Sequence, residues 1–291
     1  MIALKYVLFS GCSIPHKENG YEVSARKVAG KLGIELVDFE EANCCGFFLE
    51  SVDHLSAQVL AARDLCLAEE AGLDIVTLCT GCYGHLTKTR SHLLEDDGLR
   101  EEVNKILQKV GREFKGTSKV KHFTQVLLED IGIEKIKDTI TKPLNNLRVV
   151  SHWGCHILKP SEELHFDDPE NPEQLISLIT LTKAEFVHYM EEKLCCGGPV
   201  SGVNEKLALK ILREKLESIQ KVKADAIITI CPFCHIHFDL NQLTIEEAFS
   251  EIYEIPVLHY TQLLGLAQGF TPDELGSYEN RTPVDDLLEK I

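Results

Sequence analysis

The sequence predicts an α/β protein made of two pseudo-repeated α/β halves, each with a short parallel sheet and with cysteine loops at the strand C-terminal ends. Two observations favour this fold. One order of cysteines, an isolated residue, an adjacent pair and a Cys-x-x-Cys motif, occurs twice along the 291 residues. Short apolar runs typical of strands alternate with helical patterns in both copies. Self-similarity on this scale indicates that one structural unit is duplicated.

The two copies agree closely in spacing. The isolated cysteine and the pair are separated by 31 residues in the first copy and 39 in the second, and the pair and the motif by 33 and 34. Flanking text repeats as well, because His122-Phe-Thr-Gln-Val-Leu127 resembles His259-Tyr-Thr-Gln-Leu-Leu264. We expect each of these histidines to have a structural role in a strand-to-helix turn.

A polar, proline-containing stretch, Thr141-Lys-Pro-Leu-Asn-Asn146, separates the copies. Such composition is typical of a boundary between domains. We therefore expect a first domain over residues 1–145 and a second over 146–291, the latter with an irregular tail after Gly269.

The expected elements explain how distant cysteines could meet. Each cysteine group follows a predicted strand, and the carboxyl ends of parallel strands share one edge of a sheet, where such sheets bind ligands. The predicted strands are 4–9, 34–39, 74–78, 147–151, 184–189 and 226–230, and the main predicted helices are 53–71 and 205–222.

Composition excludes several classes of protein. Thirty basic and 46 acidic residues give a net charge of −16, which argues against nucleic acid or an anionic membrane surface as the main partner. No apolar run approaches the roughly 18 residues of a spanning helix, and the N-terminus lacks a small-residue cleavage site. We expect a cytoplasmic protein without a membrane span, in which 11 cysteines indicate metal or redox chemistry rather than disulfide staples.

Five thiols in each copy exceed what common sites need. A structural zinc takes four ligands, and so do ordinary iron–sulfur clusters. Because thiolate-rich sites select soft metals, the fifth sulfur favours an iron–sulfur assembly of unusual nuclearity. Zinc, a disulfide relay and coincidental packing remain alternatives.

The cysteine pattern and its flanking text resemble the tandem CCG-domain family, in particular the B subunit of heterodisulfide reductase. The resemblance covers nearly the whole chain and includes Leu73-Asp-Ile-Val-Thr-Leu-Cys-Thr-Gly-Cys-Tyr-Gly84, Gly154-Cys-His-Ile-Leu-Lys-Pro160 and Val120-Lys-His-Phe-Thr. The loops after the cysteine pairs, Gly46-Phe-Phe48 and Cys196-Gly-Gly-Pro199, depart from the family pattern.

The resemblance implies two noncubane 4Fe-4S clusters and reduction of the mixed disulfide of coenzyme M and coenzyme B between them. It further implies an electron-bifurcating complex with a flavin-bearing A subunit, an iron–sulfur C subunit, and a hydrogenase or formate dehydrogenase module. The implied ligands are Cys12, Cys44, Cys45, Cys79 and Cys82 for one cluster, and Cys155, Cys195, Cys196, Cys231 and Cys234 for the other.

Disulfide reduction also needs protons and a site for an anionic substrate. His156 directly follows Cys155 and His152 precedes it by three residues, so these are the candidate catalytic histidines, although either could instead be hydrogen-bonded to the backbone. Lys159 and Lys193 are the candidate cations for the substrate's acidic groups, unless they are ordinary solvated lysines.

Two other functions fit the pattern. Tandem CCG subunits also occur in relatives that act in succinate, lactate or glycolate oxidation. The chain could alternatively be a noncatalytic electron-transfer or zinc scaffold subunit.

Overall fold

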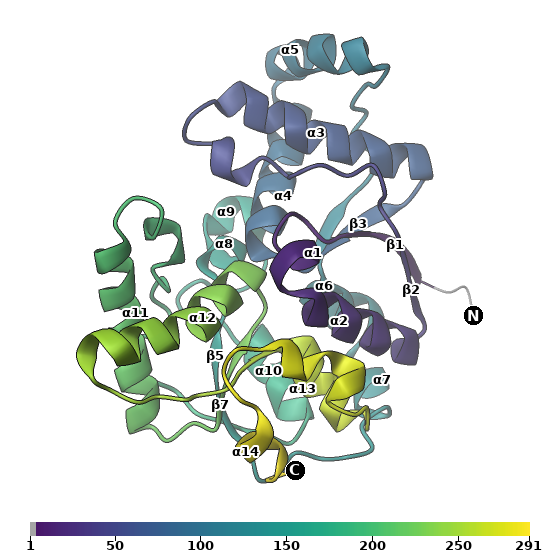
Figure 1. Cartoon of the computed structure of the whole chain (residues 1–291). Coiled ribbons are helices and arrows are strands. Elements are labelled where there is room, and N and C mark those ends of the chain that lie inside the picture. The colour runs from purple at the N-terminus through teal and green to yellow at the C-terminus, as the bar shows by residue number, and fades with distance from the viewer. Residues whose placement is uncertain (1–3) are drawn as a thin grey trace.

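The computed structural model describes residues 4–291, which form two four-stranded parallel sheets with helices around them (Figure 1). The strand order is β2-β1-β3-β4 in the first sheet and β6-β5-β7-β8 in the second, so the halves repeat the same topology. The strands are β1 (Leu4–Phe9), β2 (Ile34–Val37), β3 (Asp74–Thr77), β4 (Val120–His122), β5 (Arg148–His152), β6 (Glu185–Phe186), β7 (Ala226–Thr229) and β8 (Val257–His259).

The repeat extends to strand register. Phe9 at the end of β1 pairs with Thr77 of β3, and His152 at the end of β5 pairs with Thr229 of β7. The α/β class and the six strands predicted from the sequence are therefore confirmed, and β4 and β8 complete the sheets. His122 and His259 do lie in strand-to-helix turns, where each side chain takes part in a capping box at the following helix.

Fourteen α-helices lie within residues 4–291. Those of the first half are α1 (Ile14–Lys17), α2 (Asn19–Leu32), α3 (His54–Ala71), α4 (Thr80–Glu95), α5 (Asp97–Leu107), α6 (Phe123–Gln125) and α7 (Ile133–Lys137). Those of the second half are α8 (Cys155–Leu158), α9 (Ser161–Leu164), α10 (Gln174–Leu181), α11 (Glu205–Lys221), α12 (Pro232–Phe249), α13 (Tyr260–Ala267) and α14 (Asp285–Leu288).

The long helices α3 and α11 begin in the same way. The Asp53 side chain accepts a hydrogen bond from the Ser56 amide at 3.0 Å, and the Asn204 side chain accepts one from the Leu207 amide at 3.1 Å. Such side chains satisfy amides that have no partner within the helix. The first α-helix after each cysteine pair thus begins at an equivalent residue.

The halves share a hydrophobic core. One buried cluster runs from Tyr6 and Leu8 of the first sheet to Val149 and Ile228 of the second, and it includes residues of α2 and α13. Two smaller clusters lie beneath α3 and α4 and beneath α11 and α12. The shared core fixes how the two sheets face each other. Within residues 4–291, no helix combines the length and the apolar character needed to cross a bilayer.

The tail after Gly269 is short-helical rather than wholly irregular. It contains 3-10 turns at Asp273–Leu275 and Ser277–Glu279, followed by α14. Glu279 accepts a hydrogen bond from the Gly20 amide at 2.9 Å, so the tail fastens onto α2 of the first half.

Candidate metal centre

The cysteine groups lie just beyond the carboxyl ends of three strands in each half, as the spacing predicts. Cys79 and Cys231 are the N-caps of α4 and α12, so each Cys-x-x-Cys motif begins a long helix. A helix N-terminus presents free amides and a partial positive charge, which stabilises thiolates and other anions. Both motifs therefore place sulfur where negative charge is favoured.

The loop after each cysteine pair turns at a glycine. Gly46 has φ +90° and Gly197 has φ +91°. A Cβ on Gly46 would lie 2.7 Å from the Ala57 carbonyl oxygen, and one on Gly197 would lie 2.9 Å from that of Ala208. Only glycine adopts this conformation and approach without strain, so these residues bring the pairs back against α3 and α11.

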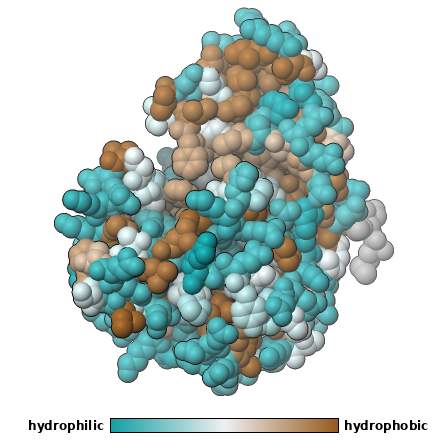
Figure 2. Space-filling model, in the orientation of Figure 1, coloured by the Kyte–Doolittle hydropathy of each residue, from teal (hydrophilic) through white to brown (hydrophobic). Residues whose placement is uncertain are grey.

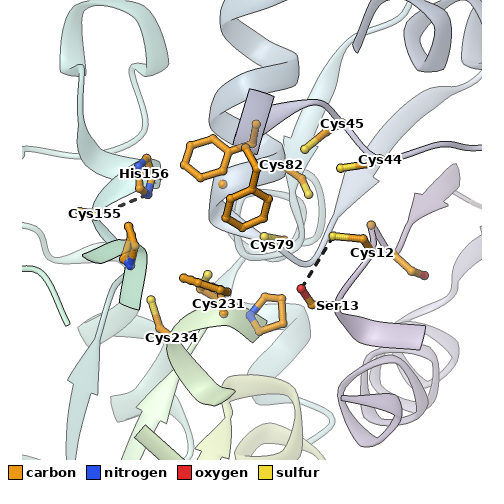
Figure 3. Close-up of a pocket in the computed structure, with 18 of the residues that line it drawn as sticks. Cys12, Ser13, Cys44, Cys45, Cys79, Cys82, Cys155, His156, Cys231 and Cys234 are labelled. Atoms are coloured by element: carbon orange, nitrogen blue, oxygen red, sulfur yellow. Dashed lines mark hydrogen bonds between the residues drawn. The ribbon is translucent and has the colours of Figure 1, made fainter. Parts of the chain in front are cut away.

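The ten thiols form one continuous series of neighbours, in which Cys196 and Cys234 are hydrogen-bonded. In the first half Cys12 contacts Cys44, Cys44 contacts Cys45, Cys45 contacts Cys82, and Cys82 contacts Cys79. In the second half the order is Cys155, Cys195, Cys196, Cys234 and Cys231. Cys79 and Cys231 join the two series. Figure 3 shows sulfurs of both halves around one cavity.

The sulfur geometry suits a shared metal. The sulfur atoms of Cys196 and Cys234 are 3.8 Å apart. Two thiolates on one tetrahedral metal, each about 2.3 Å from it, are separated by roughly 3.8 Å. In each half, five thiols on three loops, with the Cys-x-x-Cys motif at a helix N-terminus, fit a multinuclear metal cluster.

Hydrogen bonds within the series favour thiolates at three positions. The pKa of Cys45 is lowered chiefly by a hydrogen bond from Cys44, that of Cys195 by one from Cys155, and that of Cys231 by one from Cys234. The thiolate is the form that binds metal. In each half, the thiolate form is thus favoured at one or more of the candidate ligands.

The cavity between the two sets measures about 630 Å³, its mouth included. Nine of the ten cysteines line it, and Cys195 lies behind them beside Cys155 and Cys196. Figure 2 shows the opening as a hollow between the lobe of α3 and α5 and the lobe of α11 and α12, with apolar residues around it. The cysteine-bearing wall is therefore reachable from solvent on one side.

Aromatic rings from both halves meet in this cavity. Phe47 packs edge-on against Phe48 and His156, with ring centres 5.3 and 4.6 Å apart. Phe48 contacts Phe233, which lies inside the second Cys-x-x-Cys motif, at 5.6 Å. These rings restrict water beside the cysteines and give the cavity an apolar wall.

The two candidate histidines differ in position. His156 lines the cavity, where its Nδ1 is 3.5 Å from the Cys155 sulfur. His152 does not line it, since its side chain is buried behind Cys196 and Cys234. Burial lowers the pKa of His156, and it lowers that of His152 to about 3, so the neutral imidazole is favoured in both.

The candidate lysines do not reach the cavity. Lys159 is exposed and lies 3.8 Å from Glu170, and Lys193 is exposed and donates to the Glu170 carbonyl oxygen at 2.5 Å. Among residues 4–291, the cavity lining contains no lysine or arginine. The sequence suggested these lysines only because they are near cysteines along the chain.

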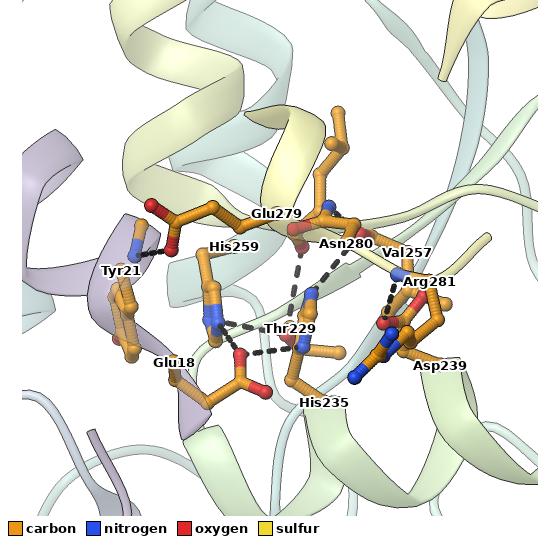
Figure 4. A network of polar contacts seen from close by, with 12 residues as sticks. Glu18, Tyr21, Thr229, His235, Asp239, Val257, His259, Glu279, Asn280 and Arg281 are labelled. Carbon is orange, nitrogen blue, oxygen red and sulfur yellow. Dashed lines mark hydrogen bonds and ion pairs between the residues drawn. The ribbon is translucent and has the colours of Figure 1, made fainter. Parts of the chain in front are cut away.

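The structure also reveals a buried network beside the site that the sequence did not indicate (Figure 4). Glu18 lies 2.7 Å from His235 Nδ1 and 2.9 Å from His259 Nε2, so one carboxylate of the first half engages two histidines of the second. Although burial raises it, the pKa of Glu18 is lowered to about 2 by these two hydrogen bonds. Burial lowers the pKa of His235, but Glu18 outweighs burial and raises that pKa, which favours the charged imidazole.

This network does not have the geometry of a metal site. The rings of His235 and His259 are stacked 3.9 Å apart at 16°, with Tyr21 stacked on the other face of His259. A metal about 2 Å from each imidazole nitrogen lies in both ring planes, which stacked rings cannot share. The cluster is an ion pair that joins the two halves.

Comparison with known proteins agrees with this architecture. A cysteine-rich domain family, CCG, matches the chain twice, at residues 6–87 and 149–239. The fold and the site thus define a tandem CCG-domain protein. A Helicobacter pylori crystal structure described as a hypothetical protein has the same fold, with a TM-score of 0.77, 15% identity, and coverage of 96% of this chain and 52% of its own.

Relatives with higher sequence identity indicate which family of CCG-domain proteins the chain belongs to. The B subunit of the ferredoxin/F420H2-dependent CoB-CoM heterodisulfide reductase of Methanosarcina acetivorans is 40% identical over 99% of this chain and 97% of its own length. A protein of Archaeoglobus profundus named as similar to the heterodisulfide reductase B subunit is 36% identical over 99% and 98%. An 8-methylmenaquinol:fumarate reductase membrane anchor subunit of Wolinella succinogenes is 32% identical over 95% and 96%. The chain belongs to the family of heterodisulfide reductase B subunits.

Proposed function

We propose that this chain is the catalytic subunit that reduces the coenzyme M–coenzyme B heterodisulfide to two thiols. The observation that carries the proposal is the meeting of two five-cysteine sets at one cavity, joined through Cys79 and Cys231. The 40% and 39% identical relatives from Methanosarcina bear the name of this enzyme's B subunit, which supports the same substrate here.

Each five-cysteine set would hold one noncubane 4Fe-4S cluster. When bound, such clusters supply electrons one at a time. Cys12, Cys44, Cys45, Cys79 and Cys82 would hold the first, and Cys155, Cys195, Cys196, Cys231 and Cys234 the second.

The reaction explains the duplicated site. Cleaving the sulfur–sulfur bond takes up two electrons and two protons and yields two thiols, so a single one-electron donor would leave a thiyl radical. The cavity lets one disulfide face both sets at once, and the rings of Phe47, Phe48 and Phe233 orient it and limit water there. His156, on the cavity wall, is the proposed proton donor, and because its neutral form is favoured it would take up each proton from solvent before passing it to a product sulfur.

The electrons have to reach this chain from other subunits. We propose a flavin-bearing A subunit and an iron–sulfur C subunit as partners, in a cytoplasmic electron-bifurcating complex with a hydrogenase or formate dehydrogenase module. The CCG units would divide near residue 145, between the two family matches. Lys159 and Lys193, outside the cavity, would contact only parts of the substrate that extend beyond its mouth.

The test is disulfide reduction by the intact protein under anaerobic conditions, with a reduced viologen dye as electron donor. Cys195→Ser should abolish turnover of the heterodisulfide and alter the iron content. Cys66→Ala is the matched control, because Cys66 is buried in α3 outside both sets. A colourless zinc protein, or full activity in Cys195→Ser, would refute the proposal and favour a scaffold role.

A further inference from the structure

The two five-cysteine sites are built alike but are backed by different residues. The last strand residue behind the first site is Phe9, and its equivalent behind the second site is His152, because both pair with the equivalent threonines Thr77 and Thr229. Both side chains are buried. A hydrocarbon ring in one half is thus replaced by an imidazole in the other.

A second difference lies on the helices that follow the cysteine pairs. Counted from the N-caps Asp53 and Asn204, Asp64 of α3 and Lys215 of α11 occupy the same helical position. Asp64 is 0% exposed and Lys215 is 1% exposed. Equivalent buried positions therefore carry a carboxyl group in the first half and an ammonium group in the second.

Each of these side chains holds the loop that leads to its cysteine pair. Asp64 accepts hydrogen bonds from the Asn43 amide and side chain at 2.9 and 3.0 Å. Lys215 donates to the Glu191 carbonyl oxygen and lies 5.5 Å from the centre of the Tyr189 ring. Since both loops are held, the difference between the halves is one of charge.

His152 and Lys215 act on the same sulfurs. A ring nitrogen of His152 lies within 4.8 Å of the Cys196 and Cys234 sulfurs, and neither ring nitrogen has a hydrogen-bond partner in the described structure. Lys215 lies over the Tyr189 ring, and Tyr189 packs in the same buried cluster as Cys196 and Cys234. Burial lowers the pKa of Lys215 to about 8, so the ammonium form still predominates at pH 7.

A buried positive charge favours the more negative state of a neighbouring centre, because the low-dielectric interior screens it weakly. In the first half, Arg63 donates to Asn43 of the equivalent loop, but it is partly exposed and lies 4.0 Å from Glu41. Solvent and this pairing weaken its effect. Glu191 is the acid that faces Lys215, and it is retained in every variant below.

We propose that Lys215, assisted by the buried imidazole of His152, makes the second five-cysteine centre easier to reduce than the first. The centre of the second half is then reduced before the centre of the first half. Lys215 acts through the field at the cysteines and does not touch the substrate. The inference rests on the proposed iron–sulfur centres.

The experiment is an anaerobic redox titration of the full-length protein, with both centres followed by electron paramagnetic resonance. Lys215→Met should lower the midpoint potential of the higher-potential centre by at least about 59 mV for one electron. At the wild-type midpoint, the oxidised form of this centre should then exceed the reduced form at least tenfold. Lys215→Arg should restore the wild-type midpoint potential. His152→Phe, which introduces the residue found at the equivalent position Phe9, should lower the midpoint potential of the same centre.

Asp64→Asn is the matched control at the equivalent position and should leave the higher-potential centre unchanged. Iron content and circular dichroism check each variant, and if Lys215→Met does not fold, Lys215→Gln and His152→Phe carry the test. Two titrating centres whose midpoints do not change in these variants would overturn this inference alone. An iron-free wild type would overturn the proposed function with it.

Discussion

Replacing Glu18 with glutamine tests the buried ion pair that joins the two halves beside the candidate site. The carboxylate is only 9% exposed and faces His235 and His259 at 2.7 and 2.9 Å. Glutamine keeps the size of the side chain and removes its charge. The charged His235 then loses its counterion in the interior, which is a strongly destabilising arrangement.

The size of the effect follows from the pKa. Glu18 titrates at about 2 instead of 4.5. Each pKa unit is worth about 1.4 kcal/mol, so the folded state favours the carboxylate by about 3 kcal/mol. We expect Glu18→Gln to lower the free energy of unfolding by about 3 kcal/mol at pH 6.

The stability that this ion pair contributes is lost at low pH through Glu18 and at high pH through His235. The pKa of Glu18 is depressed, so its contribution is complete above pH 4.5 and is lost as the pH falls from 4.5 towards 2. The pKa of His235 is raised, so its contribution is complete below pH 6.5 and is lost as the pH rises through its folded value. The difference between wild type and Glu18→Gln should therefore be largest between about pH 4.5 and 6.5.

Urea unfolding followed by the fluorescence of Trp153, the single tryptophan, measures this difference. Glu274→Gln is the control, because Glu274 also joins the halves, through Lys27 at 3.5 Å, but is exposed to solvent. It should cost less than about 1 kcal/mol. A difference for Glu18→Gln that is equally small, or that does not vary between pH 5 and 8, would refute the reasoning.

Four further substitutions test the site itself. Gly46→Ala and Gly197→Ala each force a Cβ against a carbonyl oxygen at positive φ, so each should lower stability by more than about 1 kcal/mol and reduce iron content, measured by metal analysis. Unchanged iron content in both would contradict the role of these turns. Phe48→Ala removes a ring that is 54% exposed at the cavity and should raise KM for the heterodisulfide several-fold with iron content unchanged; an unaltered KM would exclude contact between that ring and the substrate. Cys66→Ala should keep activity while losing about 1 kcal/mol of stability in urea unfolding, and loss of activity in a folded variant would place Cys66 in the site.

The sequence predicted the convergence of the cysteines because it depends on local rules. Strand ends share an edge, and the spacing of Cys12, the pairs and the motifs follows the strands. These local rules could not predict the contact between Cys79 and Cys231. That contact depends on how the two halves pack, which is set by a core that joins Tyr6 to Ile228.

Proximity along the chain does not give the direction of a side chain. Lys159 and Lys193 are close to cysteines in sequence but lie near Glu170 on the surface. Lys215 is distant from the cysteine motifs in sequence, and Glu18 is near only Cys12, yet both pack beside the site. Their positions follow from tertiary packing, which no local pattern of residues encodes.

The most direct test of two five-cysteine centres on one cavity is anomalous X-ray diffraction at the iron edge from crystals grown without oxygen. The account predicts two separate iron assemblies, one in contact with the five sulfurs of each set, on either side of the Cys79 and Cys231 junction. A single assembly, zinc in place of iron, or a set with fewer than five bound sulfurs would contradict it.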